Sequence, residues 1–154
     1  MNLSVAIVSN VILAFLAFST VAAQPLDKKV LREKGIQLLQ GCKEKVKASD
    51  TDLKQLMSHS IPESPEGLCM LECVFDTSKL MQNGKYSKSG FIQGLQPLIG
   101  DDQSKRKNVE KLASACEKEI GNAEQDKCQI AKLLVQCIVK NSGSYGINIP
   151  TPGA

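Results

Sequence analysis

The sequence has little aromatic character and a single histidine. It contains no tryptophan, two tyrosines and four phenylalanines, and two of those phenylalanines lie before residue 19. Aliphatic side chains and disulfides must therefore supply most of the stability of the fold. The one histidine, His59, provides neither an imidazole pair for a metal nor, without a free cysteine, a nucleophile and its base. No glycine-rich phosphate loop occurs either. These absences argue against an enzyme.

A strong charge of one sign is also missing. The net charge of +3 arises from mixed signs, and the segments Lys43-Glu44-Lys45 and Lys105-Arg106-Lys107 each lie near acids. No aromatic residues are interleaved with them to stack on bases, so no nucleic-acid partner is expected. A membrane-active helical effector is an alternative class, but it needs a lysine-rich helix face, and here acids are interspersed. Vesicle leakage would distinguish that class.

The first 25 residues carry no charged side chain. An apolar run from Val5 to Phe18 leads into the small residues 19–23, and a signal peptidase can cut after Ala23. We predict a secretory signal at 1–23. An uncleaved anchor is the alternative, because roughly 20 uncharged residues can also span a bilayer. In both cases the rest of the chain enters an oxidising compartment, so we expect a secreted, extracellular product with paired cysteines.

Helical periodicity extends through most of the remaining chain. Apolar positions recur every three or four residues across 24–141, with proline and glycine at the breaks. No stretch alternates as a strand would. The pattern predicts one all-α domain of about six helices, followed by an irregular tail at 142–154. The helices are expected to begin near Pro25, Ser49, Ser64, Ser87 or Ser89, Asp101 and Asn122.

Several helix boundaries carry specific signals. Ser64 and the proline that follows it predict the start of the third helix, and Asn83-Gly84 predicts its end. Pro97 is expected to interrupt the fourth helix, because an interior proline removes a hydrogen bond and clashes with the preceding turn. The sixth helix is apolar over most of its circumference. We therefore expect other helices to surround it.

Six cysteines, separated by gaps of 26, 3, 42, 11 and 8 residues, permit fifteen pairings. Cys69 and Cys73 lie on one helical face, where they could bond to each other, share a metal, or reach two other parts of the chain. A bond within the helix closes only a small loop, whereas bridges across long loops contribute roughly 3–5 kcal/mol each. Their spacing is also poor for a structural zinc site. We expect this helix to send one sulfur to each of two other helices.

The order and gaps of the cysteines resemble those of the six-cysteine insect odorant-binding proteins, the pheromone and general odorant-binding family. The segment DKCQIA at 126–131 and the turn GKY at 84–86 add to the resemblance, which extends from the first helix to about Asn141. It implies a compact bundle around an internal apolar cavity. It also implies three interlocked disulfides, namely Cys42–Cys73, Cys69–Cys128 and Cys116–Cys137.

The function implied by this resemblance is that of a secreted carrier. Such a protein binds small hydrophobic molecules, such as odorants or pheromones, and transports them through aqueous fluid to a membrane odorant receptor. Disulfides can hold helices apart around a cavity that a purely hydrophobic core would fill. Carriage of non-olfactory lipids, amines or toxins is the alternative within the family. We expect no cofactor or metal, and either a monomer or a weak homodimer.

Candidate ligand-binding residues have two sources, and for each of them ordinary core packing is the alternative. The resemblance, anchored on the cysteines, implies Phe91, Ile92, Leu95, Val109, Leu112, Ala113, Val135 and Ile138. Helical geometry adds three residues, Met57, Met70 and Val74. A pocket with mostly aliphatic walls and few aromatic residues favours flexible chains over flat aromatic rings as ligands.

The tail at 142–154 contains two further candidates, Tyr145 and Ile147. They can lie across the pocket mouth as a lid, or they can belong to a disordered end. The tail has no carboxylate except its terminus. An acid-triggered insertion of the tail, as in the pheromone-binding branch, is therefore not expected. His59 is a candidate for pH-dependent release, with a simply solvated histidine as the alternative.

Overall fold

The computed structural model describes residues 28–121, 123 and 125–147, so the predicted signal at 1–23 lies outside the described residues. Within them, six α-helices occur with one short 3-10 helix and one two-stranded hairpin, which confirms the all-α fold of about six helices. The elements are α2 (Lys28–Val46), α3 (Asp50–Met57), α4 (Pro65–Thr77), β1 (Met81–Gln82), β2 (Lys85–Tyr86), α5 (Lys88–Ile99), α6 (Gln103–Ile120), α7 (Lys127–Ser142) and η1 (Gly143–Tyr145).

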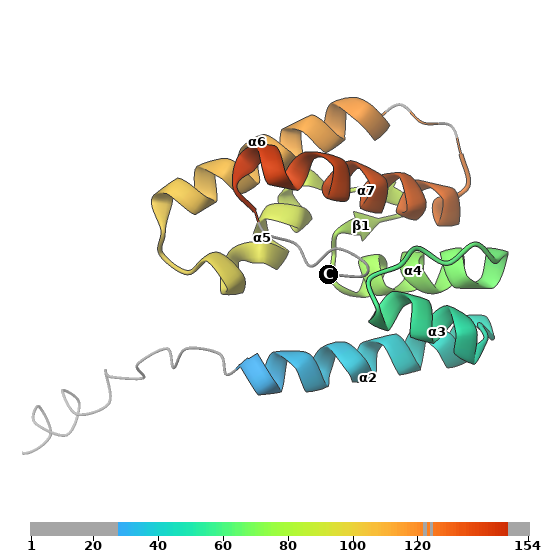
Figure 1. The fold of residues 1–154 in the computed structure, drawn as a ribbon. Coiled ribbons are helices and arrows are strands. Elements are labelled where there is room, and N and C mark those ends of the chain that lie inside the picture. The colour runs from blue at the N-terminus through green and yellow to red at the C-terminus, as the bar shows by residue number, and fades with distance from the viewer. Residues whose placement is uncertain (1–27, 122, 124, 148–154) are drawn as a thin grey trace, which may run out of the picture.

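The helices form two groups that share α4 (Figure 1). α2 and α3 pack against α4, and α2 also contacts α3. α7 packs against both α4 and α6, and α5 packs against α6. The hairpin packs between α4 and α7, because β1 contacts α4 and β2 contacts α7. α4 therefore connects the N-terminal helices to the group of α5, α6 and α7.

A buried carboxylate joins the starts of α3 and α4. Asp52 is only 4% exposed and accepts hydrogen bonds from the amide and hydroxyl of Ser49, the residue that caps α3, at 2.9 and 2.6 Å. Its other oxygen accepts a hydrogen bond from the hydroxyl of Ser64, which caps α4, at 2.6 Å. A Cβ atom added at Gly67 would overlap Asp52 and Pro62. The predicted starts of both helices are confirmed, and they belong to one polar cluster.

The end of α4 differs from the prediction. The helix ends at Thr77, and Lys79 then takes a left-handed conformation with φ 65°. Asn83 and Gly84 instead form the two-residue turn of the hairpin, with φ values of 53° and 74°. Two positive φ values suit the tight turn that matches the twist of hairpin strands, and Asn-Gly is a preferred sequence for it. The expectation of a helix end at this pair, with no strand, is therefore wrong.

The boundary between α5 and α6 is close to its prediction. Pro97 lies within the last turn of α5, which continues to Ile99 rather than stopping at the proline. α6 begins after Asp102, whose carboxylate accepts hydrogen bonds from the amides of Ser104 and Lys105 at 2.9 and 3.0 Å. This cap satisfies two of the amides that lack a partner at a helix start.

The last helix starts later and is less enclosed than predicted. α7 begins five residues after Asn122, because Asp126 caps it by accepting hydrogen bonds from the amides of Cys128 and Gln129 at 2.9 and 3.2 Å. Its contacts with α4 and α6 leave one side facing solvent, where Val139 is 41% exposed. The prediction that other helices surround this helix, which was based on its apolar circumference, therefore overstated the number of its neighbouring helices.

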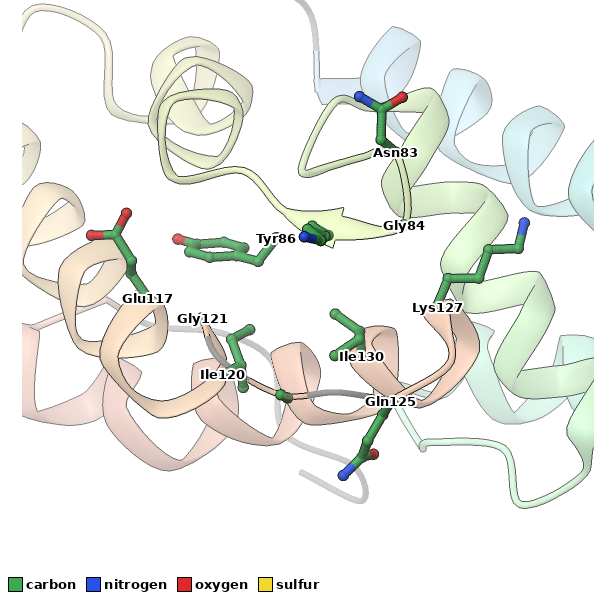
Figure 2. Close-up of a pocket in the computed structure, with 11 residues that line it drawn as sticks. Asn83, Gly84, Tyr86, Glu117, Ile120, Gly121, Gln125, Lys127 and Ile130 are labelled. Carbon is green, nitrogen blue, oxygen red and sulfur yellow. The ribbon is translucent and has the colours of Figure 1, made fainter.

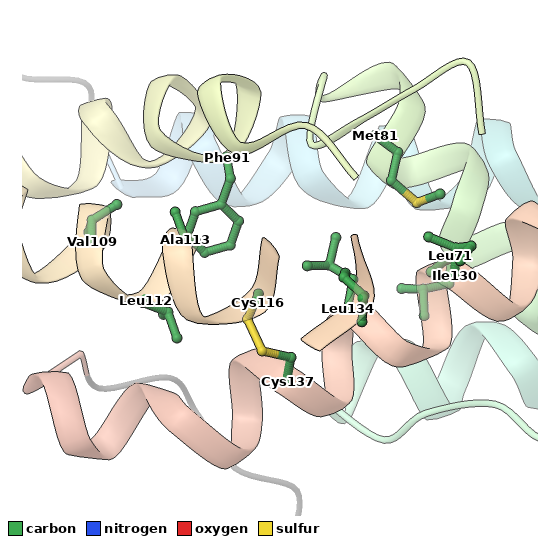
Figure 3. Packing of buried hydrophobic residues seen from close by; sticks show 12 residues of the cluster. Leu71, Met81, Phe91, Val109, Leu112, Ala113, Cys116, Ile130, Leu134 and Cys137 are labelled. Carbon is green, nitrogen blue, oxygen red and sulfur yellow. A yellow bond between two sulfur atoms is a disulfide. The ribbon is translucent and has the colours of Figure 1, made fainter. Parts of the chain in front are cut away.

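Two clusters of buried apolar side chains lie along α4. The larger joins α4 to α5, α6, α7 and the hairpin, and includes Leu71, Phe91 and Leu134 (Figure 3). The smaller joins α4 to α2 and includes Met70 and Cys73. Because the two clusters share one helix, the faces of α4 determine how the two groups of helices are spaced.

Candidate functional site

Three disulfides link α2, α4, α6 and α7. All six cysteines are bonded, and the predicted pairing is confirmed. Two of the bonds leave α4 from neighbouring turns of the same helix and reach different helices. The bonds are Cys42–Cys73 between α2 and α4, Cys69–Cys128 between α4 and α7, and Cys116–Cys137 between α6 and α7.

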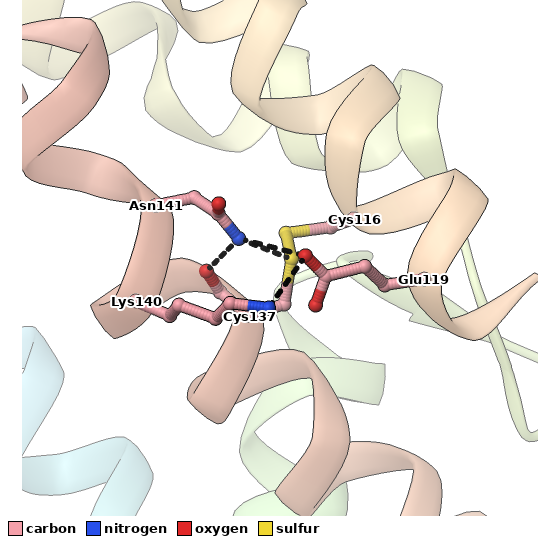
Figure 4. A network of polar contacts seen from close by, with 5 residues as sticks. All are labelled: Cys116, Glu119, Cys137, Lys140 and Asn141. Carbon is pink, nitrogen blue, oxygen red and sulfur yellow. Dashed lines mark hydrogen bonds and ion pairs between the residues drawn. A yellow bond between two sulfur atoms is a disulfide. The ribbon is translucent and has the colours of Figure 1, made fainter.

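Polar contacts surround the bond between α6 and α7 (Figure 4). The side-chain amide of Asn141 donates to the carbonyl of Cys137 at 2.9 Å and to the carboxylate of Glu119 at 3.1 Å. Lys140 forms an ion pair with the same carboxylate at 3.4 Å. These contacts join the last turn of α6 to the last turn of α7. The last turn of α7 lies immediately before η1, which contains Tyr145.

A set of apolar side chains packs against the two clusters while remaining partly accessible. Leu56 of α3 packs against both clusters. Accessible apolar surface gains about 25 cal/mol per Å² when it is removed from water, so these side chains can gain from contact with an apolar molecule. Seventeen of the described residues have this character. We call ten of them the half-buried apolar set: Leu38, Leu53, Leu56, Val74, Ile92, Leu95, Val135, Ile138, Tyr145 and Ile147. The other seven are Val46, Phe75, Leu80, Tyr86, Ile99, Ala123 and Leu133.

A cleft of about 770 Å³ lies between the hairpin and the segment that joins α6 to α7 (Figure 2). The ring of Tyr86 lies on one side, and Ile120 and Ile130 lie on the other. Glu117 is at one end and Lys127 at the opposite end. Amide and ammonium groups make up much of the rest of the lining, so this cleft differs in chemistry from the half-buried apolar set.

Tyr86 fixes the hairpin side of this cleft. Its hydroxyl donates to the carbonyl of Ala113 in α6 at 3.1 Å, and its ring lies edge-on to Phe91 with a centroid distance of 6.1 Å. Burial, and to a smaller extent the carboxylate of Glu117, raises the pKa of Tyr86 above its ordinary value. The hydroxyl therefore stays protonated at neutral pH and remains a donor.

The charged side chains at the two ends of the cleft are in ion pairs. Glu117 pairs with Lys88 at 3.1 Å, and Lys127 pairs with Glu72, whose side chain is only 8% exposed, at 3.2 Å. Lys85 also lines the cleft, but its ammonium forms no ion pair with any residue that the structure describes. The described lining therefore carries one uncompensated positive charge.

Comparison with known families identifies the chain. Residues 26–141 match the model of the PBP/GOBP family, and this segment contains all six cysteines. The chain belongs to the PBP/GOBP family. It is 26% identical over 139 residues to general odorant-binding protein 19d of Drosophila melanogaster. That alignment covers 90% of this chain and 91% of the relative.

Two solved structures share the PBP/GOBP chain's fold. The odorant-binding protein dmelOBP28a from Drosophila melanogaster has a TM-score of 0.65 at 21% identity, and covers 79% of this chain and 100% of its own. The fatty acid binding protein OBP56a from the oral disk of the blowfly Phormia regina has a TM-score of 0.59 at 17% identity. It covers 77% of this chain and 96% of its own. At these identities the likeness shows the fold alone.

The candidate residues that the PBP/GOBP resemblance implied differ in burial. Those with accessible surface beside the clusters, Ile92, Leu95, Val135 and Ile138, belong to the half-buried apolar set, as do the tail residues Tyr145 and Ile147. The others are almost completely enclosed by protein atoms, so an added molecule can reach them only if neighbouring side chains move. These enclosed residues are Phe91, Val109, Leu112 and Ala113.

The three residues added from helix geometry also separate. Met70 is completely buried in the smaller cluster, and Val74 belongs to the half-buried apolar set. Met57 is 49% exposed and lies outside both clusters. On α3 the partly buried positions are Leu53 and Leu56, which the helical stripe had grouped with Met57. Whether Met57 or Leu56 faces the cluster depends on how α3 is rotated about its axis. That rotation is set by packing against α4 and not by the periodicity of the sequence.

Other predictions about this PBP/GOBP chain concern metals, membranes and the tail. Among the described residues, no three side chains of the metal-ligating types come together to hold an ion. No helix within the described ranges is long and apolar enough to cross a bilayer. His59 is exposed. The tail, predicted to be irregular, begins with η1, and the amide of Ile147 donates to the carbonyl of Ser142 at 3.0 Å.

Proposed function

We propose that the chain is a non-enzymatic carrier that binds a small hydrophobic molecule against the half-buried apolar set. The observation that carries this proposal is the combination of two apolar clusters, fixed by disulfides to one shared helix, with apolar side chains that stay partly accessible beside them. A frame held by covalent bonds can keep such surface available, whereas an unconstrained core packs until it is filled.

The magnitude of apolar burial is sufficient for a useful carrier. A molecule that removes about 300 Å² of apolar surface from water gains about 7.5 kcal/mol, which corresponds to roughly micromolar affinity before the cost of lost motion. Of the seventeen partly buried apolar residues described beside the clusters, three are aromatic, namely Phe75, Tyr86 and Tyr145, and the other fourteen are aliphatic. Aliphatic walls adapt to flexible chains, so we propose fatty alcohols, esters, aldehydes or acids as ligands rather than flat aromatic rings.

Family membership supports the same function. The relatives' printed names describe odorant binding and, for the blowfly protein, fatty acid binding. We therefore propose a secreted carrier, cleaved after Ala23, that takes its ligand through aqueous fluid to a membrane receptor. In this proposal the carrier domain spans 24–141 and the tail at 142–154 lies over the site as a lid. Transport of non-olfactory lipids, amines or toxins remains the second candidate, and the blowfly protein's name favours lipid.

Displacement of a fluorescent naphthylamine probe tests this proposal. We expect straight-chain alcohols and acids of about ten to sixteen carbons to displace the probe at micromolar concentration, and planar aromatic molecules of equal size to displace it less well. If the disulfide-intact protein did not bind the probe stoichiometrically, the carrier function would be contradicted. A clear preference for planar aromatics would contradict the proposed ligand class while leaving carriage in place.

A further inference from the structure

The cleft between the hairpin and the α6–α7 segment contains none of the ten side chains of the half-buried apolar set, although Tyr86 and Ala123 in its lining also pack against the larger cluster. We propose that it is a second binding site, for a small molecule that combines an apolar body with a single carboxylate. Its volume of about 770 Å³ lies within the range of small-molecule sites, roughly 300–1,000 Å³. This second site does not depend on the proposed carrier function.

Both walls of the cleft are held in place by the fold itself. On the hairpin side, the hydrogen bond from Tyr86 to Ala113 and the turn at Asn83-Gly84 fix the backbone. On the opposite side, Ile120 and Ile130 belong to the larger buried cluster, and at one end Lys127 pairs with the buried Glu72. A site formed by such constraints needs little rearrangement to accept a molecule, which lowers the cost of binding.

The apolar part of the occupant is suggested by the middle of the cleft. The ring of Tyr86 faces Ile120 and Ile130, and Ala123 also lines the cleft. Ile120 and Ile130 belong to the larger buried cluster, and Tyr86 packs against it, so core packing sets the distance between these two walls. An aromatic face opposite two branched aliphatic side chains suits a flat or compact apolar group. Such rings also contribute packing energy through offset or edge contacts.

The carboxylate is suggested by the balance of charge. Glu117 is neutralised by Lys88 and Lys127 by Glu72, so Lys85 supplies the one positive charge of the described lining without a partner. A carboxylate in the cleft would gain an ion pair with the ammonium of Lys85. A ligand with an ammonium group could form an ion pair only with Glu117, which is already paired with Lys88.

A titration followed residue by residue tests the site. Unlabelled 4-phenylbutyrate, 4-phenylbutylamine and 4-phenylbutanol, which share one body, are added to the ¹⁵N-labelled chain. We expect the carboxylate to shift the amide signals of Gly84, Lys85 and Lys127, and to bind there several-fold more tightly than the alcohol or the amine. Signals of the half-buried apolar set report binding at the carrier site separately.

Lys85→Gln is the informative variant, because an exposed side chain is changed without leaving a buried charge unpaired. It should weaken 4-phenylbutyrate binding in the cleft about fivefold and leave 4-phenylbutanol binding unchanged. Lys45→Gln, which removes an exposed lysine from α2, is the matched control and should change neither affinity. Equal effects of the two variants, tighter binding of the amine, or shifts confined to Ile92 and Val135 would each overturn the proposal.

Discussion

Cys69 and Cys73 lie one turn apart on α4, and their sulfurs are bonded to two different helices, α7 and α2. This relationship makes α4 the element to which both groups of helices are covalently attached. The bond Cys42–Cys73 belongs to the smaller apolar cluster, and the third bond, Cys116–Cys137, belongs to the larger. The spacing of the groups therefore depends on α4.

The three disulfides should not contribute equally to stability. The bond Cys69–Cys128 joins residues 59 apart, and Cys116–Cys137 joins residues 21 apart. Chain-entropy estimates give about 4 kcal/mol for the former and about 3 kcal/mol for the latter. Replacing Cys69 and Cys128 together by alanine should therefore lower the free energy of unfolding more than the same change at Cys116 and Cys137. Urea denaturation of both double variants measures this, and the reverse order would contradict the entropic ranking.

Side chains that are fully enclosed and side chains that are half-buried should respond differently to substitution. Leu112→Ala removes packing from the larger cluster and should lower the free energy of unfolding by about 2–5 kcal/mol, with probe affinity of the folded protein nearly unchanged. Leu95→Trp adds volume beside accessible apolar surface and should reduce probe affinity at least tenfold, with a smaller loss of stability.

Denaturation and probe titration of both variants provide the comparison. Val139→Trp, on the exposed side of α7, is the control for adding the same large side chain, and it should leave probe affinity unchanged. If Leu112→Ala weakened the probe as strongly as Leu95→Trp did, the distinction between core and binding surface would be wrong.

Asp52 should make the protein more stable above about pH 4 than below it. Hydrogen bonds from Ser49, followed by those from Ser64, lower the pKa of Asp52, whereas the unfolded chain has the ordinary value of about 3.9. The ionised form therefore stabilises the fold fully above that unfolded value, and this stability is lost as pH falls through the lower folded pKa. Acid protonates the carboxylate and weakens the joint between α3 and α4.

Asp52→Asn is the corresponding variant. It should lower the free energy of unfolding at pH 7 by about 1–3 kcal/mol, because it weakens hydrogen bonds to a buried group. The difference from the unmodified chain should shrink between pH 4 and pH 2. Thermal denaturation across this range measures it, with the exposed Glu63→Gln as the control. A difference that stays constant with pH would show that Asp52 acts through packing alone.

A side chain at Gly84 should destabilise the hairpin turn. Its φ of 74° is unfavourable for a residue with a Cβ atom, and that atom would also lie 3.2 Å from the Cβ of Lys127. We expect Gly84→Ala to lower the free energy of unfolding by about 1–2 kcal/mol. Gly35→Ala, in the middle of α2 with open space around it, should instead stabilise by about 0.5–1 kcal/mol. Chemical denaturation of the two variants tests whether backbone conformation determines the sign.

Local signals in the sequence predicted much of the fold, and long-range packing explains what they missed. The serine caps at Ser49 and Ser64 depend on neighbouring residues, so they were readable directly. Asn83-Gly84 was ambiguous, because the same pair can end a helix or turn a hairpin. Lys85 and Lys127 line the same cleft, and a site formed by residues so distant in sequence leaves no periodic pattern.

Placement of the ligand tests the central claim most directly. The chain is loaded with unlabelled decanol, and magnetisation transfer from the alcohol to ¹³C-labelled methyl groups is measured. The account predicts transfer to Ile92, Leu95, Val135 and Ile138, which come from α5 and α7 of one half-buried apolar set. Transfer confined to the exposed methyls of Val30 and Val139, or none at any methyl, would contradict a carrier that holds its ligand within the disulfide-bonded helices.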